Sequence, residues 1–163
     1  VISGFDGKPV DLDKIQYLPS DLLNMNKEQI TGMVEAAKAD YQEIVAFEML
    51  DLKVIDAVDQ HYDRKRIKGV INSSNPSDFD NDYLVSVGEF GAALGELFCQ
   101  RPGFGWLYSH PYYHSIIVHK DTGFGITVFD WAVKKFSEYG VDDGFAAKFN
   151  MALDNIEEHQ RGK

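Results

Sequence analysis

The sequence has little cysteine, little positive charge and no long apolar segment. The single cysteine, Cys99, excludes an internal disulfide framework, and its apolar neighbours predict a small core residue. No apolar run approaches the roughly 18 residues of a membrane-spanning helix. The chain does not start with a basic segment followed by an apolar one. We therefore expect no membrane segment and no signal peptide, and cytoplasm is the expected compartment.

The chain has only 16 Lys and Arg but 26 Asp and Glu, which gives a formal net charge of −10. Nucleic-acid binding needs clustered Lys and Arg to contact phosphates, so this class of partner is disfavoured. The short basic run Arg64–Arg66 with Lys68 is interpreted as a helix C-terminus, where cations favour the helix dipole. If the partner is a macromolecule, the charge favours a protein with a basic surface.

Apolar residues make up 44% of the chain and aromatic residues 13%, which is enough for a core. The length of 163 residues predicts one globular domain over 1–163. Residues 1–25 contain scattered glycine, proline and apolar positions. We expect them to form an extended lead-in that packs on the domain.

A helical period of apolar residues extends from residue 26 to about residue 62. Asn26 and Gln29 have the spacing of a capping box, which predicts a helix start at Asn26. One long helix or two helices with a break near 49–53 both fit the pattern, and typical helix lengths favour the break. The polar run 69–81 predicts a loop.

A second strong helical pattern covers 82–100 and contains Gly88, Gly91 and Gly95 at spacings of three and four. Each glycine costs about 1 kcal/mol relative to alanine inside a helix. We infer that another backbone approaches this glycine ridge closely.

The segment after this helix predicts a small antiparallel sheet of two to three strands and then two helices. The predicted strands are 106–109, 114–120 and 124–128, and a turn lies at 121–123. The helices are expected to start near Thr127–Asp130 and at Asp142, with Gly140 ending the first. Helices followed by a meander and further helices predict an α+β fold.

Acidic residues before the central helix resemble the spacing of an EF-hand calcium loop. Asp78, Asp80, Asp82 and Glu89 occupy template positions 1, 3, 5 and 12. Tyr83 stands where the template needs glycine, and the helical pattern includes Glu89. The alternative is that Asp80 or Asp82 caps the helix.

Histidines offer a second candidate metal site. His110 and His114 straddle a predicted turn, and with a nearby carboxylate they have the residue types of a zinc site. The alternative is that both are ordinary polar histidines. No paired cysteines or His-x-x-x-His helix accompany them.

Catalytic residues stay unassigned, and no cofactor is expected. Ser109 or Ser115 with a histidine and Asp121 or Asp130 would supply a nucleophile, base and acid. No nucleophile-elbow motif supports such a set. The aromatic residues Trp106, Tyr108, Tyr112 and Tyr113 are the candidate binding residues, since Trp and Tyr are favoured interface anchors, although core positions are the alternative.

Three motifs, 94–97 (Leu-Gly-Glu-Leu), 105–106 (Gly-Trp) and 127–130 (Thr-Val-Phe-Asp), carry a family resemblance. Their order resembles that of small uncharacterised bacterial cytoplasmic proteins, some of them similar to immunity proteins of contact-toxin systems. The resemblance covers about the central third of the chain and implies binding rather than catalysis.

The primary hypothesis is therefore an acidic, non-enzymatic protein-binding module, immunity- or adaptor-like. One alternative is a metal-binding protein or small hydrolase that uses the His110 and His114 region. Another is a structural subunit of a homo-oligomer.

Overall fold

The computed structural model describes residues 9–78, 80–137 and 145–161. The elements of the described residues are α1 (Leu12–Ile15), α2 (Ser20–Tyr41), α3 (Leu52–His61), α4 (Arg64–Ser73), α5 (Asp82–Cys99), β1 (Phe104–Leu107), the 3-10 helix η1 (Tyr112–His114), β2 (Ile116–His119), β3 (Gly125–Ile126), α6 (Val128–Lys135) and α7 (Phe145–Arg161). The fold is α+β, as predicted. Within the described residues, no helix is both long enough and apolar enough to cross a membrane.

The sheet has the strand order β1-β2-β3, and both pairings are antiparallel. Trp106 of β1 and Ile126 of β3 both lie opposite Ile117 of the central strand. The first strand has the predicted length but begins two residues earlier, at Phe104, while the second and third strands are shorter than predicted. Gly123 provides the positive φ of 72° that the turn between β2 and β3 uses.

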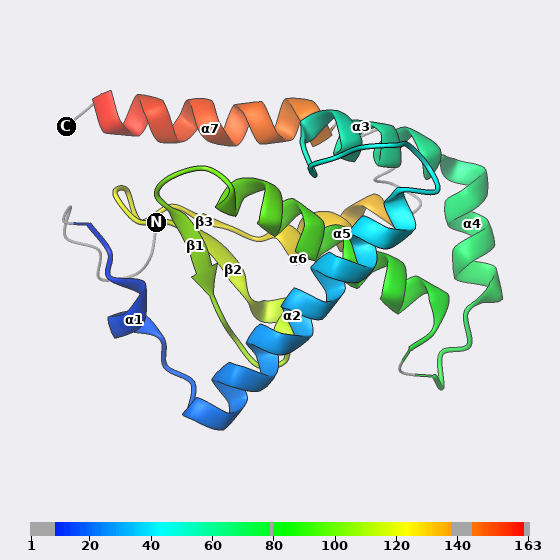
Figure 1. Ribbon diagram of the computed structural model, residues 1–163, viewed down its shortest axis with the longest axis horizontal. Coiled ribbons are helices and arrows are strands. Elements are labelled where there is room, and N and C mark those ends of the chain that lie inside the picture. The colour runs from blue at the N-terminus through cyan, green and yellow to red at the C-terminus, as the bar shows by residue number, and fades with distance from the viewer. Residues whose placement is uncertain (1–8, 79, 138–144, 162–163) are drawn as a thin grey trace.

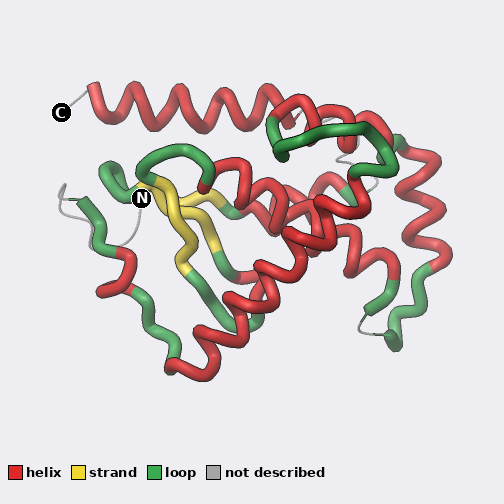
Figure 2. Tube along the Cα trace, in the orientation of Figure 1, coloured by secondary structure: helices red, strands yellow, loops and turns green. Residues whose placement is uncertain are grey.

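Helix α5 is the centre of the molecule. It packs against the sheet, α6 and α2, while α7 extends along one side of the fold (Figure 1). From Val87 to Phe98 every residue of α5 except Glu96 is buried. Helices surround the small sheet (Figure 2), so most of the core lies between helices.

The glycine ridge of α5 faces side chains, and the prediction of a close backbone was wrong. A Cβ atom at Gly91 would overlap the Phe129 ring, and one at Gly95 would overlap the Trp106 ring. The missing side chains therefore make room for aromatic rings from α6 and β1. The ridge is therefore closely packed, but at Gly91 and Gly95 it packs against aromatic rings instead of a backbone.

The segment with the first helical period forms two helices, as typical helix lengths favoured. Helix α2 ends at Tyr41 and α3 begins at Leu52, so the break lies at 42–51. The predicted start at Asn26 was wrong, because α2 already begins at Ser20 after Pro19. Asn26 is a buried interior residue of α2, and its side chain donates to the Leu22 carbonyl.

Two other helix ends differ from the sequence interpretation. The basic run 64–66 begins α4, and Asp63 caps it by accepting from the Arg66 N–H at 2.9 Å. Asp63 thus supplies the favourable negative charge at a helix start whose own first residues are basic. The cap of α5 is Asn81, which accepts from the Leu84 N–H, in place of Asp80 or Asp82. The predicted roles of Gly140 and Asp142 lie outside the described residues.

Candidate functional site

A surface groove with a volume of about 320 Å³ lies between α2 and α5. We call it the α2–α5 groove. It is lined by Gln29, Gly32, Met33 and Ala36 of α2, by Leu84, Val85 and Glu89 of α5, by Tyr112 of η1, and by Asp80. The α2 residues recur every three or four positions, so they share one face of that helix.

The walls of this groove are apolar and partly open to solvent. Leu84 is 40% exposed and Val85 42% exposed, although both belong to the otherwise buried helix α5. Gly32 leaves open space on the α2 side. A Cβ atom at Gly88 would lie 2.8 Å from the Met33 sulfur and 3.2 Å from the Tyr112 hydroxyl, so this glycine lets both side chains cover α5.

The lining of the groove includes a buried acid, Glu89. Glu89 is only 6% exposed, and its carboxyl group hydrogen-bonds with the side chain of Asp40, one turn beyond Ala36 on α2. Burial, followed by the hydrogen bond and the negative charge of Asp40, raises the pKa of Glu89 to about 8. At neutral pH Glu89 therefore holds its proton and donates it to Asp40.

Two tyrosines face this carboxyl pair. Tyr41 is buried, and burial followed by the charge of Glu89 raises its pKa well above the usual value. Tyr62, at the end of α3, hydrogen-bonds with Ser86, and burial raises its pKa as well. Both phenols stay neutral at physiological pH, so they add no charge to this cluster.

Glu89 was not predicted to be a buried acid. The sequence placed it either at position 12 of a calcium loop or within the helical pattern. The available signal was its position among apolar and small residues: between 87 and 98, Glu89 and Glu96 are the only charged residues. Asp40 had no comparable signal, because its proximity to Glu89 depends on how α2 crosses α5.

The predicted aromatic binding residues do not form one surface. Trp106 and Tyr108 line a second groove, of about 450 Å³, between the N-terminal segment and β1. The Lys27 ammonium lies 5.7 Å from the centre of the Tyr108 ring. Tyr112 lines the α2–α5 groove, and Tyr113 is 51% exposed beside it in η1.

A third groove, of about 360 Å³, lies between α7 and the end of the sheet. Its lining includes Arg101, His119, Asp154 and Glu157. His119 is buried, its Nδ1 lies 2.8 Å from the Thr122 hydroxyl, and burial lowers its pKa. This groove combines both signs of charge, so its electrostatics select no particular ligand.

The candidate histidines have different surroundings. The Nδ1 atom of His110 lies 3.1 Å from the Asn26 amide nitrogen, which makes it an acceptor for that amide. His114 is exposed and packs its ring against Tyr113. Across the described ranges, no three His, Cys, Asp or Glu side chains gather closely enough to hold a metal ion.

Three of the candidate calcium residues, Asp78, Asp80 and Asp82, are exposed, whereas Glu89 is buried. Asp78 and Asp80 lie in the loop before α5, and Asp82 is the first residue of that helix. Positions five to twelve of the template, from Asp82 to Glu89, are therefore helical and do not form an EF-hand loop.

The candidate nucleophiles are engaged in local structure. The Ser115 hydroxyl accepts from the Ser109 N–H at 2.9 Å, and the Ser109 hydroxyl accepts from Tyr17 at 2.7 Å. Burial raises the pKa of the Cys99 thiol to about 12, so thiolate is scarce at neutral pH. The hydrogen bonds of Ser109 and Ser115 account for both serines as structural groups.

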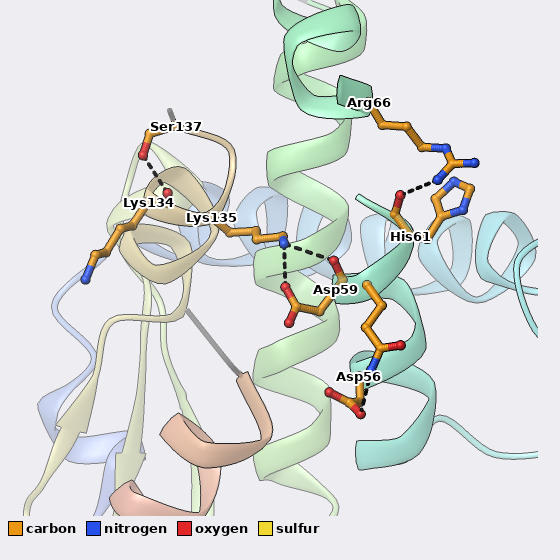
Figure 3. A network of polar contacts seen from close by, with 8 residues as sticks. Asp56, Asp59, His61, Arg66, Lys134, Lys135 and Ser137 are labelled. Atoms are coloured by element: carbon orange, nitrogen blue, oxygen red, sulfur yellow. Dashed lines mark hydrogen bonds and ion pairs between the residues drawn. The ribbon is translucent and has the colours of Figure 1, made fainter. Parts of the chain in front are cut away.

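A second buried acid is paired with a cation. Lys135 of α6 is 1% exposed and donates to the Asp59 carbonyl at 2.9 Å, while its ammonium also forms an ion pair with the Asp59 carboxylate (Figure 3). Burial raises the pKa of Asp59, and the hydrogen bond and charge of Lys135 oppose that shift. This pair ties α3 to α6.

Comparisons with protein-family models, with curated proteins and with solved structures each gave no match to this chain.

Proposed function

We propose that the chain is an acidic, non-enzymatic protein-binding module, immunity- or adaptor-like, that binds its partner through the α2–α5 groove. The partner segment presents apolar side chains and positive charge. The cytoplasm remains the proposed compartment. The observation that carries the proposal is the exposure of Leu84 and Val85 beside acidic residues in one groove.

The first support for the proposal is the apolar surface that a partner would remove from water. Leu84, Val85 and Met33 line a concave surface, and a partner side chain placed there would remove apolar area from water. Each Å² of apolar surface so buried contributes about 25 cal/mol. Apolar groups in a pocket with a polar rim are typical of interface anchors.

The second support is the negative charge of the chain, which selects the class of partner protein. The net charge of −10 attracts basic proteins and accelerates their encounter at low salt. Asp80 lines the groove and Asp82 is exposed two residues away. A second copy of this chain would place like charges opposite one another, so these acids favour a basic partner over a homo-oligomer.

Site-specific photo-crosslinking tests the groove. A photoreactive amino acid at Leu84 should capture a protein that the same residue at Met151 does not, since Met151 is 62% exposed on α7, a helix that does not line the groove. The captured protein is then purified, and calorimetry measures its affinity for the wild type and for Val85→Asp. Weaker binding by Val85→Asp at low salt supports the proposal. Equal binding by both proteins, or equal capture at Leu84 and Met151, contradicts it.

A further inference from the structure

We propose that an arginine side chain of the partner enters the α2–α5 groove and binds the carboxyl pair of Glu89 and Asp40. This inference rests on the proposed function and names the group that the groove recognises. The guanidinium would lie between α2 and α5, with its aliphatic part along the apolar walls.

The pair lacks a cation inside the described fold. Glu89 is buried, and its polar partner is a second acid. No ion pair joins Glu89 or Asp40 to a described Lys, Arg or His. Burying the Glu89 carboxyl beside the exposed carboxyl of Asp40 is unfavourable unless a proton or a cation compensates the charge. In the unbound protein the compensation is the proton on Glu89, and an arriving cation can replace it.

The geometry favours arginine over lysine. The two carboxyl groups come from different helices, so one ligand must offer donors in more than one direction. The planar guanidinium has five donors and can contact two carboxylates, whereas an ammonium acts as a compact point charge. Met33 and Val85 line the same groove as Glu89, which suits the apolar stem of a long cationic side chain.

Binding must then be coupled to proton release. With a pKa of about 8, Glu89 is roughly 90% protonated at pH 7 in the unbound protein. A guanidinium favours the carboxylate, so its arrival expels this proton. The groups that face Glu89 are Asp40, Tyr41 and Tyr62, and the raised pKa values of the tyrosines keep them neutral in this range. Affinity for arginine should therefore rise between pH 6.5 and 8.5.

The probe is the capped tripeptide N-acetyl-Leu-Arg-Leu-amide, added to the isotope-labelled full chain and followed by NMR. Matched tripeptides carry lysine or uncharged citrulline in place of arginine. We expect the arginine peptide to shift the signals of Asp40, Val85 and Glu89, and to bind about tenfold more tightly than the citrulline peptide. Lysine should bind with intermediate affinity.

Variants separate recognition from folding. Glu89→Gln keeps the size of the protonated side chain and should weaken arginine binding about tenfold while abolishing its pH dependence. The control is Glu96→Gln, on the same helix but outside the groove lining, and it should bind as the wild type does. Thermal unfolding of each variant checks the fold.

The outcomes separate this inference from the proposed function. Equal binding of arginine and citrulline, or full binding by Glu89→Gln, overturns the arginine site. Lysine binding as tight as arginine overturns the choice of guanidinium. If none of the peptides shifts the groove signals, the arginine site is also rejected, whereas Leu84 crosslinking still decides whether the groove binds a protein.

Discussion

Two buried acids of this protein, Asp59 and Glu89, have opposite partners. Asp59 meets the ammonium of Lys135, which is sealed from solvent between α3 and α6. Glu89 lines an open groove and meets another acid, the exposed Asp40. A buried acid with its own cation serves as a tie between helices. A buried acid without one is neutralised by a proton, and we propose that an external cation can replace that proton.

Removing Lys135, the cation that pairs with Asp59, should have the largest effect on the free energy of unfolding. Lys135→Met leaves the Asp59 carboxylate buried without its partner, which typically costs about 3–5 kcal/mol of unfolding free energy. Urea denaturation at pH 7 measures this loss. Lys53→Met on α3 is the control, because Lys53 is exposed and its change should stay within about 0.5 kcal/mol. A loss below about 1 kcal/mol in Lys135→Met would show that the ion pair is not a tie.

The second largest effect should be a pH dependence that arises from Glu89. Its folded pKa of about 8 lies above its ordinary value of 4.5, so the folded state holds more protons between these values. Stability from this group is complete below about pH 4.5 and is lost as pH rises through 8, by roughly 2–4 kcal/mol. Urea denaturation of the wild type and of Glu89→Gln from pH 5 to 9 measures the difference. Parallel curves for the two proteins would contradict the shared proton.

Replacing each of the two acids by leucine at constant pH should have a smaller effect on the unfolding free energy, and the sign should differ between them. Glu89→Leu at pH 8 should raise the unfolding free energy by about 1 kcal/mol or leave it unchanged, because no buried cation loses its partner. Asp59→Leu should lower it, because Lys135 remains buried. Denaturation of both variants under one condition makes the comparison. A large loss in Glu89→Leu would mean that the carboxyl pair itself holds α2 against α5.

The smallest effect concerns the apolar wall of the groove. Val85→Thr should change the unfolding free energy by less than about 0.5 kcal/mol, since Val85 is 42% exposed. Val87→Thr is the matched variant two residues along α5, where the side chain is buried, and it should cost about 1–2 kcal/mol. Thermal unfolding compares the two. Equal costs would mean that Val85 contributes to the core.

Local patterns predicted much of this fold. The apolar period of 82–100 identified α5 almost to its ends, and the aromatic segments identified an antiparallel sheet. Helix α4 was not predicted, because the basic run was interpreted as a helix end and 69–81 as a loop, and the capping by Asp63 was not considered. The ridge of Gly88, Gly91 and Gly95 indicated close packing, but the sequence does not say which distant side chains fill the space.

The sequence by itself determined the acidic charge, the α+β class and the helical face that α5 buries, because composition and periodicity are local properties. Only the tertiary structure decided that Glu89 meets Asp40 while Asp59 meets Lys135. These partners lie 49 and 76 residues apart, and their contacts depend on how α2 crosses α5 and how α6 meets α3. A carboxylate in a helical sequence has no fixed role until the fold supplies its neighbour and its exposure to water.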